Sequence, residues 1–401
     1  MTDDIIKTAN AVFAKTYARY PVVFEKGSGC TLWDINGKRY TDFVAGIAVC
    51  NLGHANPRIV KALTDQAQTL WHVSNLYYTI SQTALAQMLV DHSFADRVFL
   101  CNSGTEANEA AIKLARKYFQ DKGEKKRFRM ISMQASFHGR TMASLSATGQ
   151  AKIKKGFDPV LTGFDFVPFN DINALEEKID ENVCAVIIEP VQGEGGVNCP
   201  DPGYLQKVRR LCDQRGCLLI FDEIQTGMGR TGKLFAYDHF EITPDIMTLA
   251  KALGNGLPIG AMLAKEDIAA AFGPGTHAST FGGTPLVAAA ACETLKIMVE
   301  DDVPAKAAEM GAYLKKRLAQ LKGRHDCIVD IRGMGLLVGM ELTCAGTPIV
   351  TACLEKGFVI NCIQERVLRF IPPLVVDSKM IDALVACLDT VLTEMIDYRS
   401  R

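Results

Sequence analysis

The sequence has no feature typical of a protein that binds nucleic acid or spans a membrane. Its 401 residues carry 44 Lys and Arg against 45 Asp and Glu, which gives a net charge of −1. No basic run is long enough to follow a phosphate backbone, since the densest is residues 122–129. The long uncharged stretch at residues 268–292 is interrupted by Gly and Pro, which predicts a loop and not a membrane span. We therefore expect no nucleic acid and no membrane as partner.

Paired cysteines and metal-ligand clusters are also missing. The 13 cysteines are an odd number, lie singly in apolar segments and include no Cys-x-x-Cys pair. This pattern is typical of reduced core thiols in a cytoplasmic protein. No cluster of His, Cys and Asp has the spacing of metal ligands, so we expect no metal. The amino terminus lacks the apolar core of a signal peptide.

The chain does contain many apolar runs that alternate with helical segments. About half of the residues, 48%, are hydrophobic, enough to bury a large core in more than one domain. The alternation of strand-like runs and helices predicts an α/β body with a mostly parallel sheet. We expect an N-terminal arm or small-domain segment at residues 1–45, a large domain at 46–295 and a smaller α+β domain at 296–401.

Two of the apolar runs bring an acid and a lysine to the ends of neighbouring strands. The run 218–221 leads to Asp222, and the run 246–250 leads to Lys251. Ligands of open α/β sheets bind just beyond such strand ends. Pyridoxal phosphate (PLP) needs both groups, because its aldehyde condenses with an amine and a carboxylate keeps its ring nitrogen protonated. We therefore predict that Lys251 binds the aldehyde carbon and that Asp222 faces the ring nitrogen.

The alternative for this pair is a surface lysine and an acid that caps a helix. Lysines are rarely buried, which favours that alternative for any single lysine. Here the neighbours of Lys251 on both sides are Ala and Leu, so burial is expected. Burial would lower the pKa of Lys251 and leave a nucleophilic amine.

A turn of small residues between a strand and a helix is the second informative feature. The run 98–101 leads into Asn-Ser-Gly-Thr at 102–105, and a strong helix follows at 106–119. Backbone amides at such a helix start attract an anion, helped by the helix dipole. An ordinary cap by Ser103 or Thr105 would explain the turn as well. Beside the acid and the lysine, however, the turn predicts a phosphate site.

Further candidate residues follow other strands. Phe137 can stack on a planar cofactor ring, although Phe is more often a core residue. Arg140, next to a glycine, can hold a substrate carboxylate through two hydrogen bonds. The apolar run 183–188 leads to Glu189, which we interpret as a structural acid, and to Glu194.

Together these motifs resemble the class III, or ω-amino acid, aminotransferases of PLP fold type I over essentially the whole chain. The resemblance implies a large PLP-binding domain with a mostly parallel sheet and a smaller α+β domain. The motifs that carry it are, in chain order, NSGTEANEAA (102–111), FHGRT (137–141), IIEPVQGEGG (187–196), DEIQTGMGRTG (222–232), AKALGNGLPIGA (250–261) and STFGG (279–283).

Carried onto these positions, the resemblance implies roles in binding the cofactor. Lys251 is the catalytic residue and Gln225 bonds the ring hydroxyl. Phosphate is bound by the turn that holds Ser103, Gly104 and Thr105, together with Thr280 of a partner subunit. The resemblance therefore also implies a homodimer with two shared active sites.

The resemblance implies substrate-binding residues as well. Arg140, with Ser279 nearby, would bind one substrate carboxylate, and Arg369 would bind the α-carboxylate of glutamate. Glu194 would neutralise Arg369 when a donor with a single carboxylate is bound, and would move away for glutamate.

The reaction implied is transfer of the side-chain amine of N2-acetyl-L-ornithine to 2-oxoglutarate, which gives N-acetyl-L-glutamate 5-semialdehyde and L-glutamate. The apolar Ile47 gives a free α-ammonium group no partner, which favours an acylated donor. Succinylornithine, N-succinyl-diaminopimelate, ornithine and 4-aminobutyrate stay open as donors. A PLP aminomutase or epimerase of the same fold is a further alternative, although two substrate arginines favour an enzyme with a dicarboxylate co-substrate.

Overall fold

The central element of the structure is a seven-stranded sheet. The computed structural model describes residues 1–399. The strands are, in spatial order, β4 (Arg97–Cys101), β10 (Gly260–Ala264), β9 (Ile246–Leu249), β8 (Leu218–Asp222), β7 (Val183–Ile188), β5 (Arg129–Met133) and β6 (Phe164–Val167). Strands β9, β8, β7, β5 and β6 run parallel, whereas β10 is antiparallel to both of its neighbours. The sheet is mostly parallel, so the predicted α/β class is confirmed.

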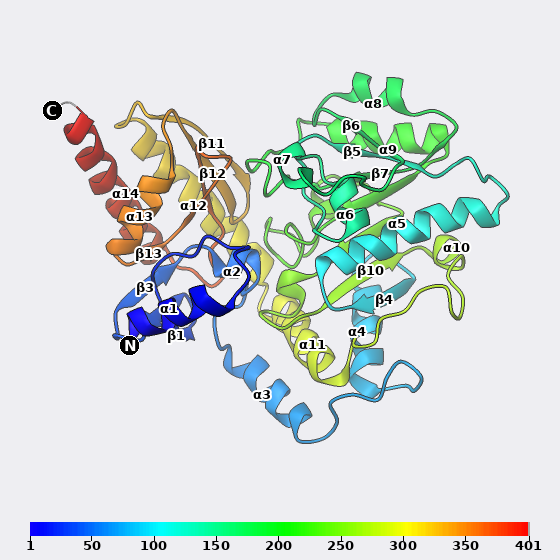
Figure 1. Cartoon of the computed structure of the whole chain (residues 1–401), viewed down its shortest axis with the longest axis horizontal. Coiled ribbons are helices and arrows are strands. Elements are labelled where there is room, and N and C mark those ends of the chain that lie inside the picture. The colour runs from blue at the N-terminus through cyan, green and yellow to red at the C-terminus, as the bar shows by residue number, and fades with distance from the viewer. Residues whose placement is uncertain (400–401) are drawn as a thin grey trace.

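Helices cover both faces of this sheet (Figure 1). The helices of this part of the chain are α3 (Pro57–Ala67), α4 (Ile80–Asp91), α5 (Gly104–Asp121), α6 (Met142–Ala147), α7 (Ala151–Lys154), α8 (Ile172–Lys178), α9 (Tyr204–Arg215), α10 (Glu266–Ala269) and α11 (Pro285–Glu300), with short 3₁₀ turns η1 (Ala236–His239) and η2 (Lys251–Leu253). Along β8, Leu218 and Ile220 pack in the cluster that contains α5, while Leu219 and Phe221 pack in the cluster on the other face. Because β8 is apolar on both sides, it is a central strand that ends in a polar residue.

Two smaller sheets stand beside the large one. The first has the order β1 (Phe24–Ser28), β2 (Thr31–Asp34), β3 (Arg39–Asp42) and β13 (Phe358–Val359). The second has the order β11 (Ile328–Met334), β12 (Leu337–Leu342), β15 (Val367–Phe370) and β14 (Asn361–Ile363). Their helices are α2 (Ala45–Ala48), α12 (Val303–Lys322), α13 (Thr347–Glu355) and α14 (Ser378–Arg399). Since β13 pairs in parallel with β3, segments from the two ends of the chain share one sheet.

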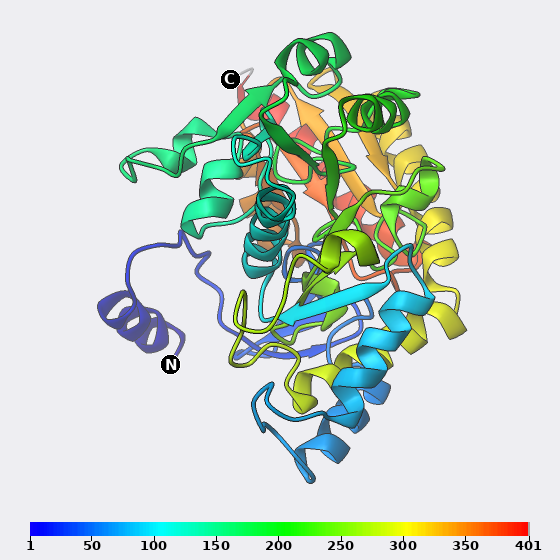
Figure 2. The ribbon, with the colours of Figure 1, turned by 90° about the vertical axis from the view of Figure 1, so that its right-hand side faces the viewer.

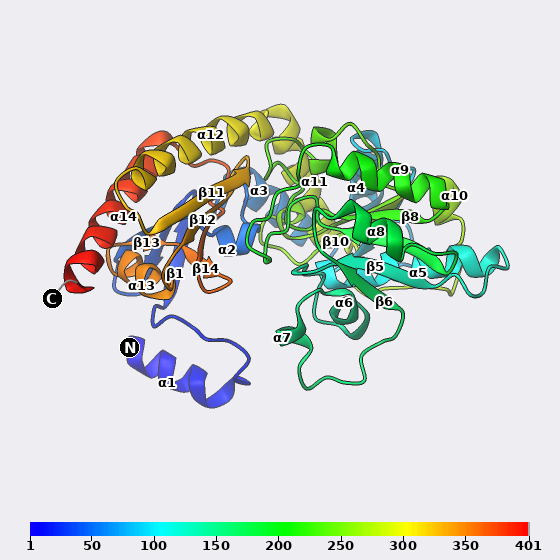
Figure 3. The ribbon, with the colours of Figure 1, turned by 90° about the horizontal axis from the view of Figure 1, so that it is seen from above.

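The first helix, α1 (Thr2–Val12), lies apart from these sheets. None of its residues is buried. Figures 2 and 3 show it standing away from the body of the molecule, joined by an extended segment.

The stretch 268–292 is only partly the loop that its Gly and Pro residues predict. Its centre lies outside helices, but its last residues belong to α11, which starts at Pro285. Proline is well tolerated at the first helical position, where its missing N–H has no intrahelical partner anyway. Within residues 1–399, no helix is both long and apolar enough to cross a membrane.

Candidate active site

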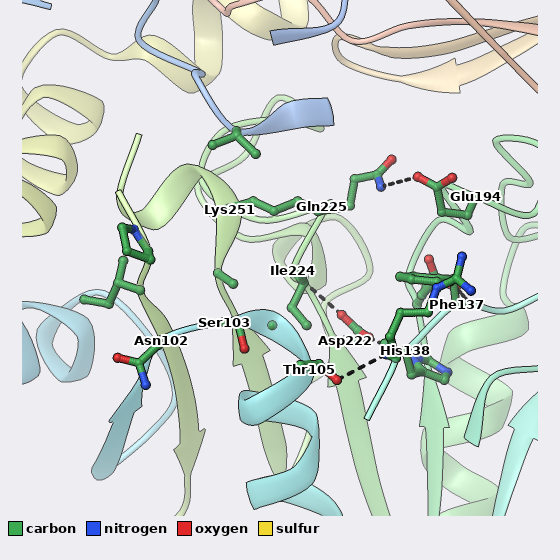
Figure 4. Close-up of a pocket in the computed structure, with 18 of the residues that line it drawn as sticks. Asn102, Ser103, Thr105, Phe137, His138, Glu194, Asp222, Ile224, Gln225 and Lys251 are labelled. Atoms are coloured by element: carbon green, nitrogen blue, oxygen red, sulfur yellow. Dashed lines mark hydrogen bonds and ion pairs between the residues drawn. The ribbon is translucent and has the colours of Figure 1, made fainter. Parts of the chain in front are cut away.

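The carboxyl ends of β8 and β9 lie side by side and open into a cavity of about 460 Å³. Figure 4 shows side chains from several separate segments pointing into it. The predicted site residues that line this cavity are Ser103, Gly104, Thr105, Phe137, Arg140, Glu194, Asp222, Gln225 and Lys251. The cavity has the size of a typical small-molecule site.

Lys251 stands at an unusual point of the backbone. It begins the turn η2 directly after β9 and has a φ of 46°, a left-handed value that residues other than glycine rarely adopt. Such outliers are typical of positions where the surrounding structure holds a side chain in one direction. Burial lowers the pKa of the Lys251 amine, although the carboxylate of Glu194 opposes this shift. The amine is therefore available as a nucleophile at a lower pH than an ordinary lysine.

Asp222 is almost fully buried and has several hydrogen-bond partners. Its Oδ1 accepts from the backbone N–H of Ile224 at 3.1 Å. Its Oδ2 accepts from Asn108 Nδ2 at 2.8 Å and lies 2.7 Å from His138 Nδ1. Our sequence analysis singled out neither Asn108 nor His138, because an Asn inside a helix and a His beside a Phe have no distinctive pattern of their own.

The start of α5 leaves backbone donors for an anion. Ser103 caps the helix by accepting from Glu106 N–H at 3.3 Å. The bond of Ala107 N–H to the Ser103 carbonyl, at 3.1 Å, is the first of the helix. The N–H groups of Gly104 and Thr105 precede that bond, so they are free for a ligand in the cavity.

Two apolar side chains line the cavity beside this turn. Phe137, whose backbone N–H donates to Glu189 at 2.9 Å, is one, and Ile224 is the other (Figure 4). A Cβ on Gly104 would lie 2.8 Å from Cδ1 of Ile224, so only glycine lets this isoleucine pack against the helix start. The sequence analysis missed Ile224, because an apolar residue after a strand is usually part of the core.

Arg369 lies behind the cavity wall and contacts two of the lining residues. Its Nη1 is 2.6 Å from Glu194 Oε1 and donates to Gln225 Oε1 at 3.1 Å. Gln225 in turn donates to Glu194 Oε1 at 3.3 Å. Burial alone would raise the pKa of Glu194, but the charges of Arg369 and Lys251 outweigh it and lower that pKa. Glu194 and Arg369 therefore form an ion pair at the cavity wall.

The remaining predicted residues are placed less centrally. Arg140 is exposed at the cavity, with its guanidinium 5.6 Å from the centre of the Phe137 ring. Ser279 accepts from Asn102 Nδ2 at 3.0 Å and is not part of the cavity lining. Thr280 is exposed and lines a neighbouring hollow. A single chain therefore does not bring Thr280 to the Gly104 turn.

A left-handed turn at residues 45–48 stands near the cavity. All four residues have positive φ values, between 51° and 69°. Such a turn costs about 1–2 kcal/mol per residue that carries a Cβ. Asp42 holds it, because its Oδ1 accepts from Val44 N–H at 2.8 Å and Ala45 N–H at 2.9 Å. The other oxygen of Asp42 lies 2.7 Å from His54 Nε2.

This turn changes the expectation for Ile47. Ile47 is 43% exposed, and Val49, which our sequence analysis did not single out, lines the cavity in its place. Four left-handed residues in succession rotate the chain in a way that a strand or helix pattern does not predict.

The site fits PLP. A lysine with a lowered pKa and a buried carboxylate stand at neighbouring strand ends, and free amides and apolar side chains lie beside them. Glycines keep the walls close to each other: a Cβ on Gly139 would lie 2.3 Å from Thr105 Oγ1, and one on Gly193 would lie 2.1 Å from Gln225 Oε1. These features define the site of a PLP-dependent enzyme of fold type I.

Comparison with known families confirms this class. Residues 12–392 match the family model of class III aminotransferases, so the chain belongs to that family and is a PLP-dependent aminotransferase. An acetylornithine aminotransferase of Methanocaldococcus jannaschii is 51% identical over 379 residues, which cover 94% of this chain and 95% of the relative. One from Myxococcus xanthus is 45% identical and covers 95% of this chain and 96% of the relative.

Solved structures show the same fold. The ornithine aminotransferase of Toxoplasma gondii ME49 superposes with a TM-score of 0.96 at 36% identity, covering 99% of this chain and 96% of that one. A second structure of that enzyme, crystallised in the presence of oxidised glutathione, has PLP at partial occupancy in its active site. The acetylornithine aminotransferase of Elizabethkingia anophelis superposes with a TM-score of 0.88 at 32% identity, covering 98% of this chain and 99% of that one.

Proposed function

We propose that the enzyme transfers the side-chain amine of N2-acetyl-L-ornithine to 2-oxoglutarate, a step of arginine biosynthesis. The products are N-acetyl-L-glutamate 5-semialdehyde and L-glutamate. The observation that carries this proposal is the contact between Arg369 and Glu194 at the cavity wall. Relatives that are 45–51% identical and are named acetylornithine aminotransferases support the choice of donor.

The two substrates place opposite demands on this pair. Glutamate presents two carboxylates, so Arg369 can take the α-carboxylate and Arg140 the γ-carboxylate. Acetylornithine reacts at its far amine and has one carboxylate, which Arg140 can take. Arg369 then keeps Glu194 as its partner, because an unpaired buried charge is costly.

The residues of the chain divide the remaining work. PLP, when bound, supplies an aldehyde for the amine and a ring that accepts electrons. The Nζ of Lys251 moves the proton at the carbon that bears the donated amine. Gly104 and Thr105 would hold the phosphate through their N–H groups, and Gln225 would hold the ring hydroxyl. Because one product leaves before the second substrate binds, the kinetics should be ping-pong.

We propose a homodimer in which Thr280 completes the phosphate site of the partner. The surface around Thr280 supports this, since Leu76, Tyr78, Ile80 and Phe281 are 59–98% exposed. So much exposed apolar surface in one region marks an interaction site. Analytical ultracentrifugation should give twice the mass of one chain, and Thr280→Ala should weaken PLP binding without changing that mass.

We also propose a cytoplasmic location and the division of the chain at residues 45 and 295. The number and spacing of the cysteines support the location. The pairing of β13 with β3 supports a smaller domain built from both ends of the chain.

A donor panel tests the function. Glutamate formation from 2-oxoglutarate is followed with N2-acetylornithine, succinylornithine, N-succinyl-diaminopimelate, ornithine and 4-aminobutyrate, and Lys251→Ala serves as the blank. N2-acetylornithine should give the highest kcat/KM. Another donor in that place would overturn the proposal for the substrate, and product formation without 2-oxoglutarate would favour an aminomutase or epimerase.

A further inference from the structure

The residues that would contact the cofactor come from four separate elements. The phosphate turn starts α5, Phe137 follows β5, Asp222 ends β8, and Lys251 follows β9. A cofactor held at all these points needs the elements to keep fixed positions relative to one another. One buried side chain, Asn108 in α5, contacts three of them.

The carboxamide of Asn108 is fully used within the protein. Its Nδ2 donates to the carbonyl of His138 at 2.7 Å and to Oδ2 of Asp222 at 2.8 Å. Its Oδ1 accepts from the hydroxyl of Thr248, in β9, at 2.8 Å. The four residues are at most 3% exposed, so water does not compete for these bonds.

His138 completes the arrangement from the other side. Its Nδ1 lies 2.7 Å from the same Oδ2 of Asp222, and its backbone N–H donates to Thr148 Oγ1 at 3.0 Å. Its Nε2 is buried and has no partner among the described residues. The ring therefore has Asp222 as its one polar contact, and the backbone of His138, bonded at both its N–H and its carbonyl, holds the ring in place.

The two carboxylate oxygens of Asp222 have different hydrogen-bond partners. Oδ2 carries the bonds with Asn108 and His138, whereas Oδ1 accepts only from Ile224 N–H among the described residues. A carboxylate oxygen has room for a further donor. Oδ1 is thus the oxygen available to a protonated ring nitrogen in the cavity.

The buried acid Glu189 makes the donors of Asp222 more important. Glu189 lines the same cavity, and burial raises its pKa; the neighbouring His138 opposes this rise, whereas the charge of Asp222 adds to it. Donated hydrogen bonds favour the charged form of a carboxylate that shares a cavity with another acid.

We propose that Asn108 is a positioning residue for the cofactor, which holds the carboxylate of Asp222 aimed at the ring nitrogen and fixes α5 and β9 relative to it. His138 is its partner on the same oxygen. The inference rests on the PLP site and not on the identity of the amino donor.

The test compares Asn108→Leu with Thr248→Val in the PLP-loaded enzyme. Asn108→Leu removes the donor to Asp222, while Thr248→Val removes only the bond to Asn108 Oδ1 and leaves Asp222 untouched. The ring nitrogen is observed by NMR with PLP labelled with nitrogen-15, and the dissociation constant of PLP is measured by equilibrium dialysis.

Asn108→Leu should shift the ring-nitrogen resonance toward the unprotonated position and raise the dissociation constant of PLP ~10-fold or more, since a hydrogen bond to a charged group is lost. Thr248→Val should leave the resonance in place. An Asn108→Leu enzyme that folds with an unchanged resonance and an unchanged dissociation constant overturns the proposal. If that variant does not fold, Asn108→Ala, which also removes the donor, is measured under the same criteria.

A double-mutant cycle with His138→Gln separates positioning from packing. Because both side chains act on Oδ2 of Asp222, the effects on the resonance should not add. Strictly additive effects would contradict a shared action. An unexpected best donor in the substrate panel would leave both measurements unaffected.

Discussion

The guanidinium of Arg369 and the carboxylate of Glu194 lie 2.6 Å apart, and Gln225 contacts both. Arg369 has no exposed surface, so its charge depends on a carboxylate from the protein or from the substrate. In the proposed reaction the α-carboxylate of glutamate would supply that partner, whereas a donor whose one carboxylate is bound by Arg140 would not. The same wall of the cavity could therefore bind substrates with one carboxylate or with two.

Glu194→Ala should weaken the half-reaction with the acylated donor by ~10-fold or more and affect the glutamate half-reaction much less. The first half-reaction leaves Arg369 unpaired, and the second does not. Stopped-flow absorbance of the bound cofactor measures each half-reaction separately. Glu194→Gln, which keeps an acceptor without the charge, should fall between the two enzymes. An equal loss in both half-reactions would contradict the exchange of partners.

Lys251→Ala should abolish turnover, while the variant still binds PLP without a covalent bond to the protein.

In the unmodified apoenzyme, the lowered pKa of Lys251 makes the neutral, reactive amine available at lower pH. The rate of covalent PLP attachment should therefore reach half its maximum below about pH 10.4, the ordinary value for lysine. Stopped-flow measurement across this range checks it, and a half-maximal rate at the ordinary value would be inconsistent with a buried amine.

Gly139→Ala should reduce PLP affinity ~10-fold or more and lower stability by roughly 1–3 kcal/mol. The new Cβ would lie 2.3 Å from Thr105 Oγ1 and 2.5 Å from Ser144 Oγ, at a residue with a φ of 136°. The added carbon would push the Thr105 turn out of place. Gly273→Ala is the matched control, because a Cβ there meets nothing within 4 Å. Equilibrium dialysis and urea unfolding should separate the two variants, and similar behaviour would refute the clash.

His54→Gln should destabilise the fold most at acidic and neutral pH. The hydrogen bond with Asp42 raises the pKa of His54 to about 10. The folded protein binds the proton of His54 more tightly than the unfolded chain does, so the protonated imidazole stabilises the fold. This stabilisation is fully present below about pH 6.5, the pKa of His54 in the unfolded chain, and is lost as the pH rises through 10. The difference in unfolding free energy between the two proteins, on the order of 3 kcal/mol near pH 6 once solvent screening of this partly exposed pair is discounted, should therefore shrink toward pH 10.

Urea unfolding at several pH values measures that difference. The expected pH dependence arises because the positive charge of His54 stabilises the carboxylate of Asp42, which in turn accepts hydrogen bonds from the left-handed turn at residues 45–48. A difference that stays constant between pH 6.5 and pH 10 would show that His54 acts through packing alone.

Local patterns were enough to predict the strands and helices that carry the site. The apolar runs before Asp222 and Lys251 are strands β8 and β9, and the small-residue turn at 102–105 does start a helix, capped by Ser103. These signals are local because strand burial, helix capping and chain reversal depend on neighbours in the sequence. The motif order likewise predicts the class III family, which the family comparison confirms.

Other expectations depended on how distant segments meet. Val49, and not Ile47, lines the cavity, because four successive left-handed residues turn the chain at 45–48. Thr280 lies outside the cavity of its own chain. Neither result can be predicted from neighbouring residues in the sequence. The left-handed turn depends on hydrogen bonds to Asp42, and the lining of the pockets depends on how whole helices and strands pack.

The sequence by itself determined the sheet-and-helix class and the cofactor, and it predicted the lysine and the acid that we propose to serve it, because each of these follows from short runs of residues. The tertiary structure decided which side chains act together. Asn108 meets Asp222 across 114 residues, and Glu194 meets Arg369 across 175. Such contacts exist only once strand order and helix packing are set, because the free energy that holds them comes from burial of the whole core and not from the local chain.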